Sequence, residues 1–286
     1  MKTKYRLPLK TRLMLLLISP FRQRSADPPT AKSIRRGRND APKIFITKWI
    51  LGKKPKLHSI DDYVIPVRDA DIRVRIYRPS EEKNLPLIMN YHGGGWVVGN
   101  LQNNDYYCAV LAKRVNAVVI SVEYRLAPEF KFPTAVHDAY DALLWATSNA
   151  AQLGIDPERI CVTGDSAGGN LATVMTLKSR DLNGPKIKFQ ALIYPATDSR
   201  MGYESMKKHA FAPILMKTDV EHYLSLYIRD EKDVVSPLLS PYRAESLANL
   251  PPALVVTAGF DPLADDGIQY AAVSYTHLTL PTICSV

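Results

Sequence analysis

The sequence has few cysteines. Cys108, Cys161 and Cys284 are the three in 286 residues, and none stands in a Cys-x-x-Cys spacing. An odd count without paired spacing predicts neither a disulfide framework nor a zinc site. We therefore expect no metal, and a chain kept in the reducing cytoplasm.

Long hydrophobic runs are also missing, and no stretch approaches the roughly 20 apolar residues of a transmembrane helix. Residues 13–18 are apolar behind a basic start, as in a signal peptide. The run is shorter than a typical signal core, and residues 21–24 offer no small-residue cleavage site. An amphipathic helix on the protein or on a membrane is the expected form.

Acidic residues are scarce in the first 56 positions, which carry 16 Lys or Arg against two Asp, or +14. The remaining 230 residues carry 21 basic and 26 acidic side chains, or −5, so the net +9 belongs to the N-terminal arm. We expect a solvated arm and no nucleic-acid partner. Peripheral contact with an anionic membrane is the alternative.

Apolar runs alternate with helical patterns over the rest of the chain. Residues 63–67 and 72–77 predict an antiparallel hairpin, because apolar and polar residues alternate there. Helical spacing at 107–116 and 134–149 separates some of the later runs. The runs that predict buried strands are 87–91, 117–124, 160–163, 191–194 and 253–258. This order predicts an α/β fold with a mostly parallel sheet covered on both faces, and a ligand site at the carboxyl ends of its strands.

The alternation lapses at residues 199–235, where Met, Tyr, Phe and Leu mix with Lys and His. We interpret this segment as a helical insertion that forms a cap over the strand ends together with residues 1–60. Its apolar side chains either contact a ligand or pack on the sheet.

One segment predicts a nucleophile. Gly164-Asp165-Ser166-Ala167-Gly168 follows a β-branched run and precedes helical spacing, as in a G-x-S-x-G elbow. Glycines on both sides let strand and helix approach while Ser166 adopts a strained backbone. The pentapeptide alone is equally compatible with a plain connecting turn.

His92-Gly93-Gly94-Gly95-Trp96 directly follows another predicted strand. Three glycines are costly in chain entropy, so a plain loop explains them poorly. Their backbone N–H groups are suited to bind a substrate oxyanion, with a further donor from Ala167. Together the two motifs predict a hydrolase.

Four motifs in order resemble the hormone-sensitive-lipase family of α/β-hydrolase carboxylesterases, over residues 63–272. They are His92 to Trp96, Tyr124-Arg125-Leu126-Ala127-Pro128-Glu129, Gly164 to Gly169 and Asp261-Pro262-Leu263. The resemblance implies a serine esterase for small esters with short to medium acyl chains, without metal or cofactor. It also implies that Ser166 is the nucleophile, Asp261 the triad acid, and Gly93, Gly94, Gly95 and Ala167 the oxyanion region.

Asp261 has support from its position alone. It follows the strand at 253–258 after a short turn and comes later than Ser166, as the chain order Ser, Asp, His requires. Without the other motifs it would be interpreted as a helix N-cap. We expect Glu129 and Asp165 to be structural carboxylates and Asp138 to belong to a helix start or a salt bridge.

The base is the missing part. A serine hydroxyl needs a histidine to accept its proton, and only His277 follows Asp261. Their separation of 16 positions is too short for the helix, strand and loop that should intervene, which together need well over about 20 residues. We therefore do not expect His277 to be the base, which stays unknown.

Residues 273–286 resemble the translation of a sequencing adapter, whereas the family-like sequence ends near Ala272. We interpret the chain as an arm (1–60), a catalytic domain (61–272) and a foreign tail (273–286). Loss of the last strand would leave the run at 253–258 as an uncovered sheet edge. The chain as written is then expected to be inactive or poorly soluble.

The predicted function is carboxylic ester hydrolysis through an acyl-enzyme. The alternative is a non-catalytic small-molecule-binding protein, because the family also resembles the gibberellin receptor, which lacks the catalytic histidine. A membrane-surface lipase held by the basic arm is a third hypothesis. A homodimer is compatible with the sequence.

Overall fold

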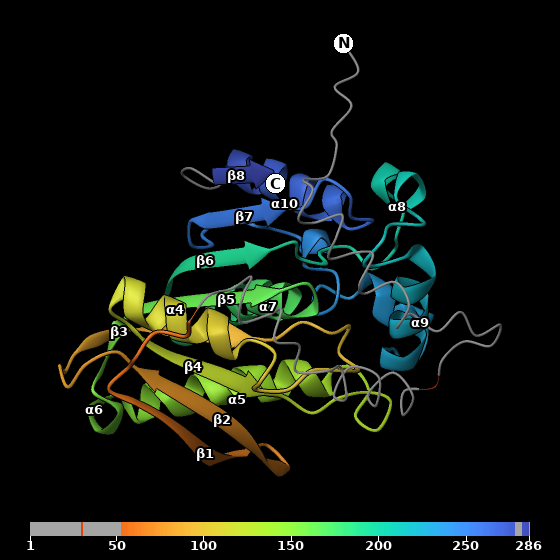
Figure 1. Cartoon of the computed structure of the whole chain (residues 1–286). Coiled ribbons are helices and arrows are strands. Elements are labelled where there is room, and N and C mark those ends of the chain that lie inside the picture. Colours follow the sequence, from red (N-terminus) through yellow and green to blue (C-terminus); the bar gives the residue numbers. More distant parts are fainter. Residues whose placement is uncertain (1–29, 31–52, 278–281, 286) are drawn as a thin grey trace.

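A computed structural model describes residues 30, 53–277 and 282–285 (Figure 1). The hypotheses about residues 13–18 and about most of the basic arm lie outside these described residues. Between them the described residues form one eight-stranded sheet in the order β1-β2-β4-β3-β5-β6-β7-β8. The predicted α/β class is confirmed.

The hairpin and the buried strands form where the sequence predicts them. β1 (Ser59–Val67) pairs antiparallel with β2 (Ala70–Arg78), which pairs antiparallel with β4. All other pairings are parallel. The parallel strands are β3 (Leu85–Tyr91), β4 (Val118–Glu123), β5 (Ile155–Asp165), β6 (Ile187–Ile193), β7 (Ala253–Thr257) and β8 (Thr282–Ser285).

Helices cover both faces of the sheet. On one face α5 (Thr134–Ser148), α7 (Ala167–Asp181) and α10 (Ala264–His277) contribute to the main apolar core. On the other face α4 (Asp105–Val115) packs through Cys108, Ala109 and Ala112. The short α6 (Ala150–Leu153) leads into β5. Because successive strand side chains point to opposite faces, β2 serves both layers.

Short helices fill the segment between β6 and β7. They are α8 (Glu204–Lys208), α9 (Lys217–Tyr227) and two 3-10 turns, η2 (Glu231–Val235) and η3 (Pro241–Arg243). In Figure 1, β6 and β7 point toward α8 and α9. Tyr227 of α9 stacks on Trp96, with ring centroids 4.7 Å apart. This contact fixes the insertion against the loop that follows β3.

The prediction that β7 has an uncovered edge is wrong. Four residues near the C-terminus form β8, which pairs with β7 from Leu254↔Thr282 to Thr257↔Ser285. α10 continues past Ala272 to His277, and the chain then returns to the sheet. Threonine and isoleucine favour extended backbone, so this short segment suffices to pair with the β7 edge.

No helix among the described residues is both long enough and apolar enough to cross a membrane.

Candidate active site

Ser166 occupies the sharp turn between β5 and α7, with φ 54° and ψ −118°. Residues other than glycine rarely adopt this backbone conformation, so the turn is strained. The Ser166 N–H donates to the Ile193 carbonyl of the neighbouring strand at 2.9 Å. A methyl group on Gly164 would overlap the Gly168 backbone, and one on Gly168 would overlap the Tyr91 carbonyl. The two glycines therefore permit the close contact of strand and helix that holds Ser166.

A cavity of about 690 Å³ opens at the carboxyl ends of the strands. Its wall includes every residue to which the sequence assigns a catalytic or oxyanion role: Ser166, Asp261, Gly93, Gly94, Gly95 and Ala167. The cap contributes apolar side chains from Ile214, Val220 and Leu224. The cavity thus joins Ser166 and the Asp261 carboxylate to an apolar chamber of the size that small ligands occupy.

The glycine loop presents two N–H groups that have no partner among the described residues, those of Gly94 and Gly95. The Ala167 N–H, at the start of α7, likewise makes no hydrogen bond within that part of the chain. The Gly93 N–H differs, because it donates to Asp165 Oδ1 at 2.9 Å. The predicted set of oxyanion donors therefore narrows to Gly94, Gly95 and Ala167.

His92 is fully buried and does not line the cavity. Its ring stacks on Tyr124 at a centroid distance of 4.3 Å, and Nδ1 lies 2.9 Å from the Gly93 carbonyl oxygen. A carbonyl only accepts, so Nδ1 carries the proton and donates. Burial lowers the pKa of His92, and the ring is therefore neutral. His92 orients the glycine loop.

Asp261 lies at the turn before α10, where its Oδ1 accepts the Leu263 N–H at 2.9 Å. Its Oδ2 accepts no hydrogen bond from the described residues. Burial raises the pKa of Asp261, and the hydrogen bond from Leu263 partly opposes this rise. The carboxylate has an open acceptor on the wall of the cavity that holds Ser166.

The sequence analysis did not identify two further residues of the site, Asp266 and Asn104. Asp266 is 1% exposed, and its Oδ1 accepts the N–H groups of Thr197 and Asp198 at 3.0 and 2.9 Å. Asn104 donates to Asp165 Oδ1 at 2.9 Å. Nothing in the sequence distinguishes Asp266 from the adjacent Asp265. Nothing in the sequence distinguishes Asn104 from the adjacent Asn103.

No histidine lines the cavity within the described part of the chain. His277 is the last residue of α10, which connects β7 to the parallel strand β8 and so leads from the carboxyl ends of the strands toward their amino ends. The other five are His58 before β1, His92, His137 on α5, His209 after α8 and His222 on α9. Among the residues whose side chains the structure describes, those that meet Ser166 and Asp261 at this cavity include no imidazole.

A family model described as "alpha/beta hydrolase fold" matches residues 88–275. An arylesterase from Saccharolobus solfataricus is 43% identical over 211 residues, which are 73% of this chain and 69% of the relative. The carboxylic ester hydrolase LipN from Mycobacterium tuberculosis is 42% identical over 76% of this chain and 60% of its own length. An ethyl acetate hydrolase from Pseudomonas putida is 37% identical, with 78% and 71% covered.

Solved structures show the same likeness. A hyperthermophilic esterase from Pyrobaculum calidifontis superposes with a TM-score of 0.90 at 38% identity, covering 98% of this chain and 90% of that one. The metagenomic carboxylesterase EstE1 superposes with a TM-score of 0.84 at 36% identity, with 90% and 87% covered.

Proposed function

This chain belongs to the hormone-sensitive-lipase family of α/β-hydrolase carboxylesterases, and from that premise we propose that it hydrolyses carboxylic esters through Ser166. The observation that carries the proposal is the convergence on one cavity of Ser166, Asp261 and the Gly94 and Ala167 N–H groups, which have no partner among the described residues.

In the proposed reaction the Ser166 hydroxyl oxygen attacks the ester carbonyl carbon and gives its proton to a base. The carbonyl oxygen becomes an oxyanion, which accepts hydrogen bonds from Gly94, Gly95 and Ala167. The bond to the alcohol then breaks, the alcohol leaves with the proton, and Ser166 carries the acyl group. Water, activated by the same base, attacks the acyl-enzyme and releases the acid.

The cavity supports esters with short to medium acyl chains. Ile214, Val220 and Leu224 offer apolar surface to an acyl or alkyl group, and the relative named an ethyl acetate hydrolase is consistent with a small substrate. The residues named in the mechanism need no metal and no organic cofactor.

We propose that none of the six histidines of this chain is the base, and that added imidazole can take its place. Since Asp261 keeps an open carboxylate oxygen on the cavity wall, a free imidazole is expected to bind between it and Ser166. One imidazole nitrogen would accept the Ser166 proton while the opposite N–H donates to Asp261.

Imidazole titration tests this function directly. We expect hydrolysis of p-nitrophenyl butyrate to rise with imidazole and to saturate, after subtraction of the rate with Ser166→Ala, which records catalysis by free imidazole. N-methylimidazole lacks the N–H for Asp261 and should rescue at least tenfold less. Equal rates for wild type and Ser166→Ala would overturn the nucleophile assignment.

The missing histidine also favours a second candidate, a non-catalytic binding protein. This candidate predicts that a short-chain carboxylic acid or ester binds tightly by calorimetry without Ser166-dependent turnover at any imidazole concentration. Saturable, Ser166-dependent turnover would exclude it.

A further inference from the structure

Asp165 stands next to the nucleophile, but its side chain points to the glycine loop. Its Oδ1 accepts two hydrogen bonds at 2.9 Å, from the Gly93 N–H and from the Asn104 side-chain amide. The contact with the loop is so close that a methyl group on Gly93 would overlap the Asp165 carboxylate. One carboxylate oxygen thus joins the end of β5 to the oxyanion loop and to the residue before α4.

Hydrogen bonds hold successive peptide groups of the glycine loop. The Tyr124 hydroxyl donates to the His92 carbonyl at 2.7 Å, and Asp165 holds the N–H of the same peptide group, that of Gly93. His92 Nδ1 holds the next carbonyl, that of Gly93. Because a trans peptide is planar, fixing the Gly93 carbonyl also fixes the direction of the Gly94 N–H. These contacts determine where an oxyanion donor points.

Asn104 is itself held from two sides. Its amide also reaches Asn90 Oδ1 at 3.4 Å, and Asn90, which is fully buried, donates to Ser121 at 3.1 Å. The backbone carbonyl of Asn104 accepts the Cys108 N–H at 2.8 Å in the first turn of α4. The amide that faces Asp165 is therefore positioned by both β3 and α4.

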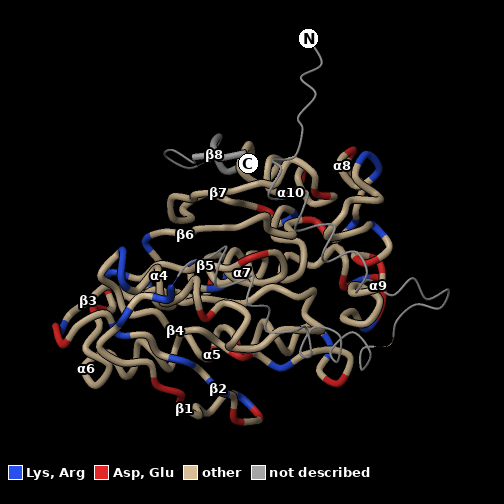
Figure 2. Tube along the Cα trace, in the orientation of Figure 1, with Lys and Arg blue, Asp and Glu red and all other residues tan. Residues whose placement is uncertain are grey.

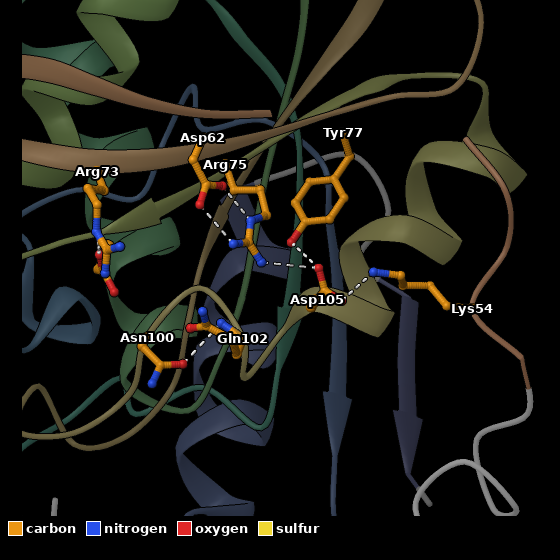
Figure 3. A network of polar contacts seen from close by, with 9 residues as sticks. Lys54, Asp62, Arg73, Arg75, Tyr77, Asn100, Gln102 and Asp105 are labelled. Atoms are coloured by element: carbon orange, nitrogen blue, oxygen red, sulfur yellow. Dashed lines mark hydrogen bonds and ion pairs between the residues drawn. The ribbon is translucent and has the colours of Figure 1, made fainter. Parts of the chain in front are cut away.

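The start of α4 is anchored on the hairpin by Asp105, the next residue (Figure 3). Asp105 accepts hydrogen bonds from Tyr77 at 3.1 Å and Arg75 at 3.4 Å, and it pairs with Lys54 at 2.7 Å. Arg75 is oriented in turn by two hydrogen bonds to Asp62, at 2.6 and 2.8 Å. A polar chain therefore leads from β1 and β2 to the position of Asn104.

We propose that Asn104 is a positioning residue for ester hydrolysis, which acts through Asp165 on the oxyanion loop. The proposal rests on the function proposed above, because it assigns the Gly94 N–H to the oxyanion. Asn104 donates to Asp165 and fixes the rotamer in which the carboxylate holds Gly93. Without that donor the carboxylate turns, the Gly93 peptide is released and the Gly94 N–H loses its direction.

Two variants test the role of Asn104. Asn104→Leu removes the donor at similar volume, and Asn104→Asp places a carboxylate against Asp165. We expect kcat for p-nitrophenyl butyrate, at saturating imidazole, to fall about 10- to 100-fold in both, somewhat less than the roughly 100- to 1,000-fold cost of losing an oxyanion donor. KM should change less than about threefold, since the apolar cap residues Ile214, Val220 and Leu224 are unchanged. Gln102→Glu, an exposed change of the same charge two residues away, is the matched control.

NMR chemical shifts of the glycine amides test the role of Asn104 independently of the proposed ester hydrolysis. In protein labelled with ¹⁵N-glycine, 14 amides are visible, and the Gly93 proton should resonate downfield because it faces a carboxylate. Asn104→Asp and Asn104→Leu should move the Gly93 and Gly94 peaks, whereas Gln102→Glu should not.

Unmoved Gly93 and Gly94 peaks, or a kcat within twofold of wild type, would overturn the role of Asn104. If wild type shows no Ser166-dependent turnover, the proposed function fails, and a shifted Gly93 peak would still confirm the contact through Asp165. A global loss of structure would instead lower the melting temperature and move most glycine peaks.

Discussion

Asp266 has one carboxylate oxygen in use and one without a partner. Oδ2 is buried and finds no hydrogen-bond partner among the described residues, while Oδ1 accepts two backbone N–H groups. Burial raises the pKa of Asp266 to about 8, although the two N–H groups oppose this rise. The side chain is thus an acid that keeps its proton at neutral pH and braces the loop after β6.

This proton predicts how stability depends on pH. The folded state holds the Asp266 proton up to about pH 8, whereas the unfolded chain loses it near pH 4. The free energy of unfolding therefore falls between these values, by at most about 1.4 kcal/mol per pH unit from this group. Asp266→Asn should flatten the slope, because the amide keeps the acceptor without titrating. Urea unfolding from pH 4.5 to 8.5 measures this slope, and parallel curves for both proteins would contradict the prediction.

The sequence predicts best those elements whose apolar residues follow a regular pattern along the chain. Apolar runs of β-branched residues gave the parallel strands, because burial on both faces requires them. Side-chain partners were beyond reach, since nothing local tells that Asp165 faces Asn104 rather than solvent. β8 was missed because four residues give too short a pattern to recognise, and its pairing depends on the free edge of β7.

β8 gives a prediction at this scale. Deleting residues 278–286 removes the partner of β7 and leaves an apolar strand edge, which favours association between chains. We expect lower solubility and stronger light scattering at equal concentration, with unfolding at lower urea. Thr282→Lys with Cys284→Lys keeps the chain length and serves as a milder test. A truncated chain as soluble and stable as the full one would refute the role of β8.

The adapter-like character of residues 273–286 stays a prediction, although part of this tail pairs with the sheet. Sequencing the genomic locus decides it: a continuous reading frame through His277 without a junction would end the hypothesis.

Net charge is distributed unevenly along the chain. Blue and red segments intersperse over the described elements, including α8 and α9 (Figure 2), and residues 57–286 carry −5 in total. The +14 of residues 1–56 is separate in sequence from this balance. We infer that any attraction to an anionic surface belongs to the first 56 residues, as the membrane hypothesis requires.

Vesicle sedimentation tests that inference. Binding to vesicles with phosphatidylserine should exceed binding to neutral vesicles and should weaken at least tenfold between about 50 and 300 mM salt, because salt screens surface charge. A variant with eight of the arm's Lys and Arg changed to Gln should lose it. Binding that persists in high salt, or in that variant, would contradict an electrostatic arm.

The backbone of Ser166 has a consequence for how the sequence can drift. Glycine adopts φ 54°, ψ −118° with little strain, so folding alone favours glycine over serine at this position, by on the order of 1 kcal/mol. A gene released from selection for its nucleophile would gain stability by losing the hydroxyl. Serine at this turn is therefore not required by the fold, as the proposed role of Ser166 as nucleophile predicts.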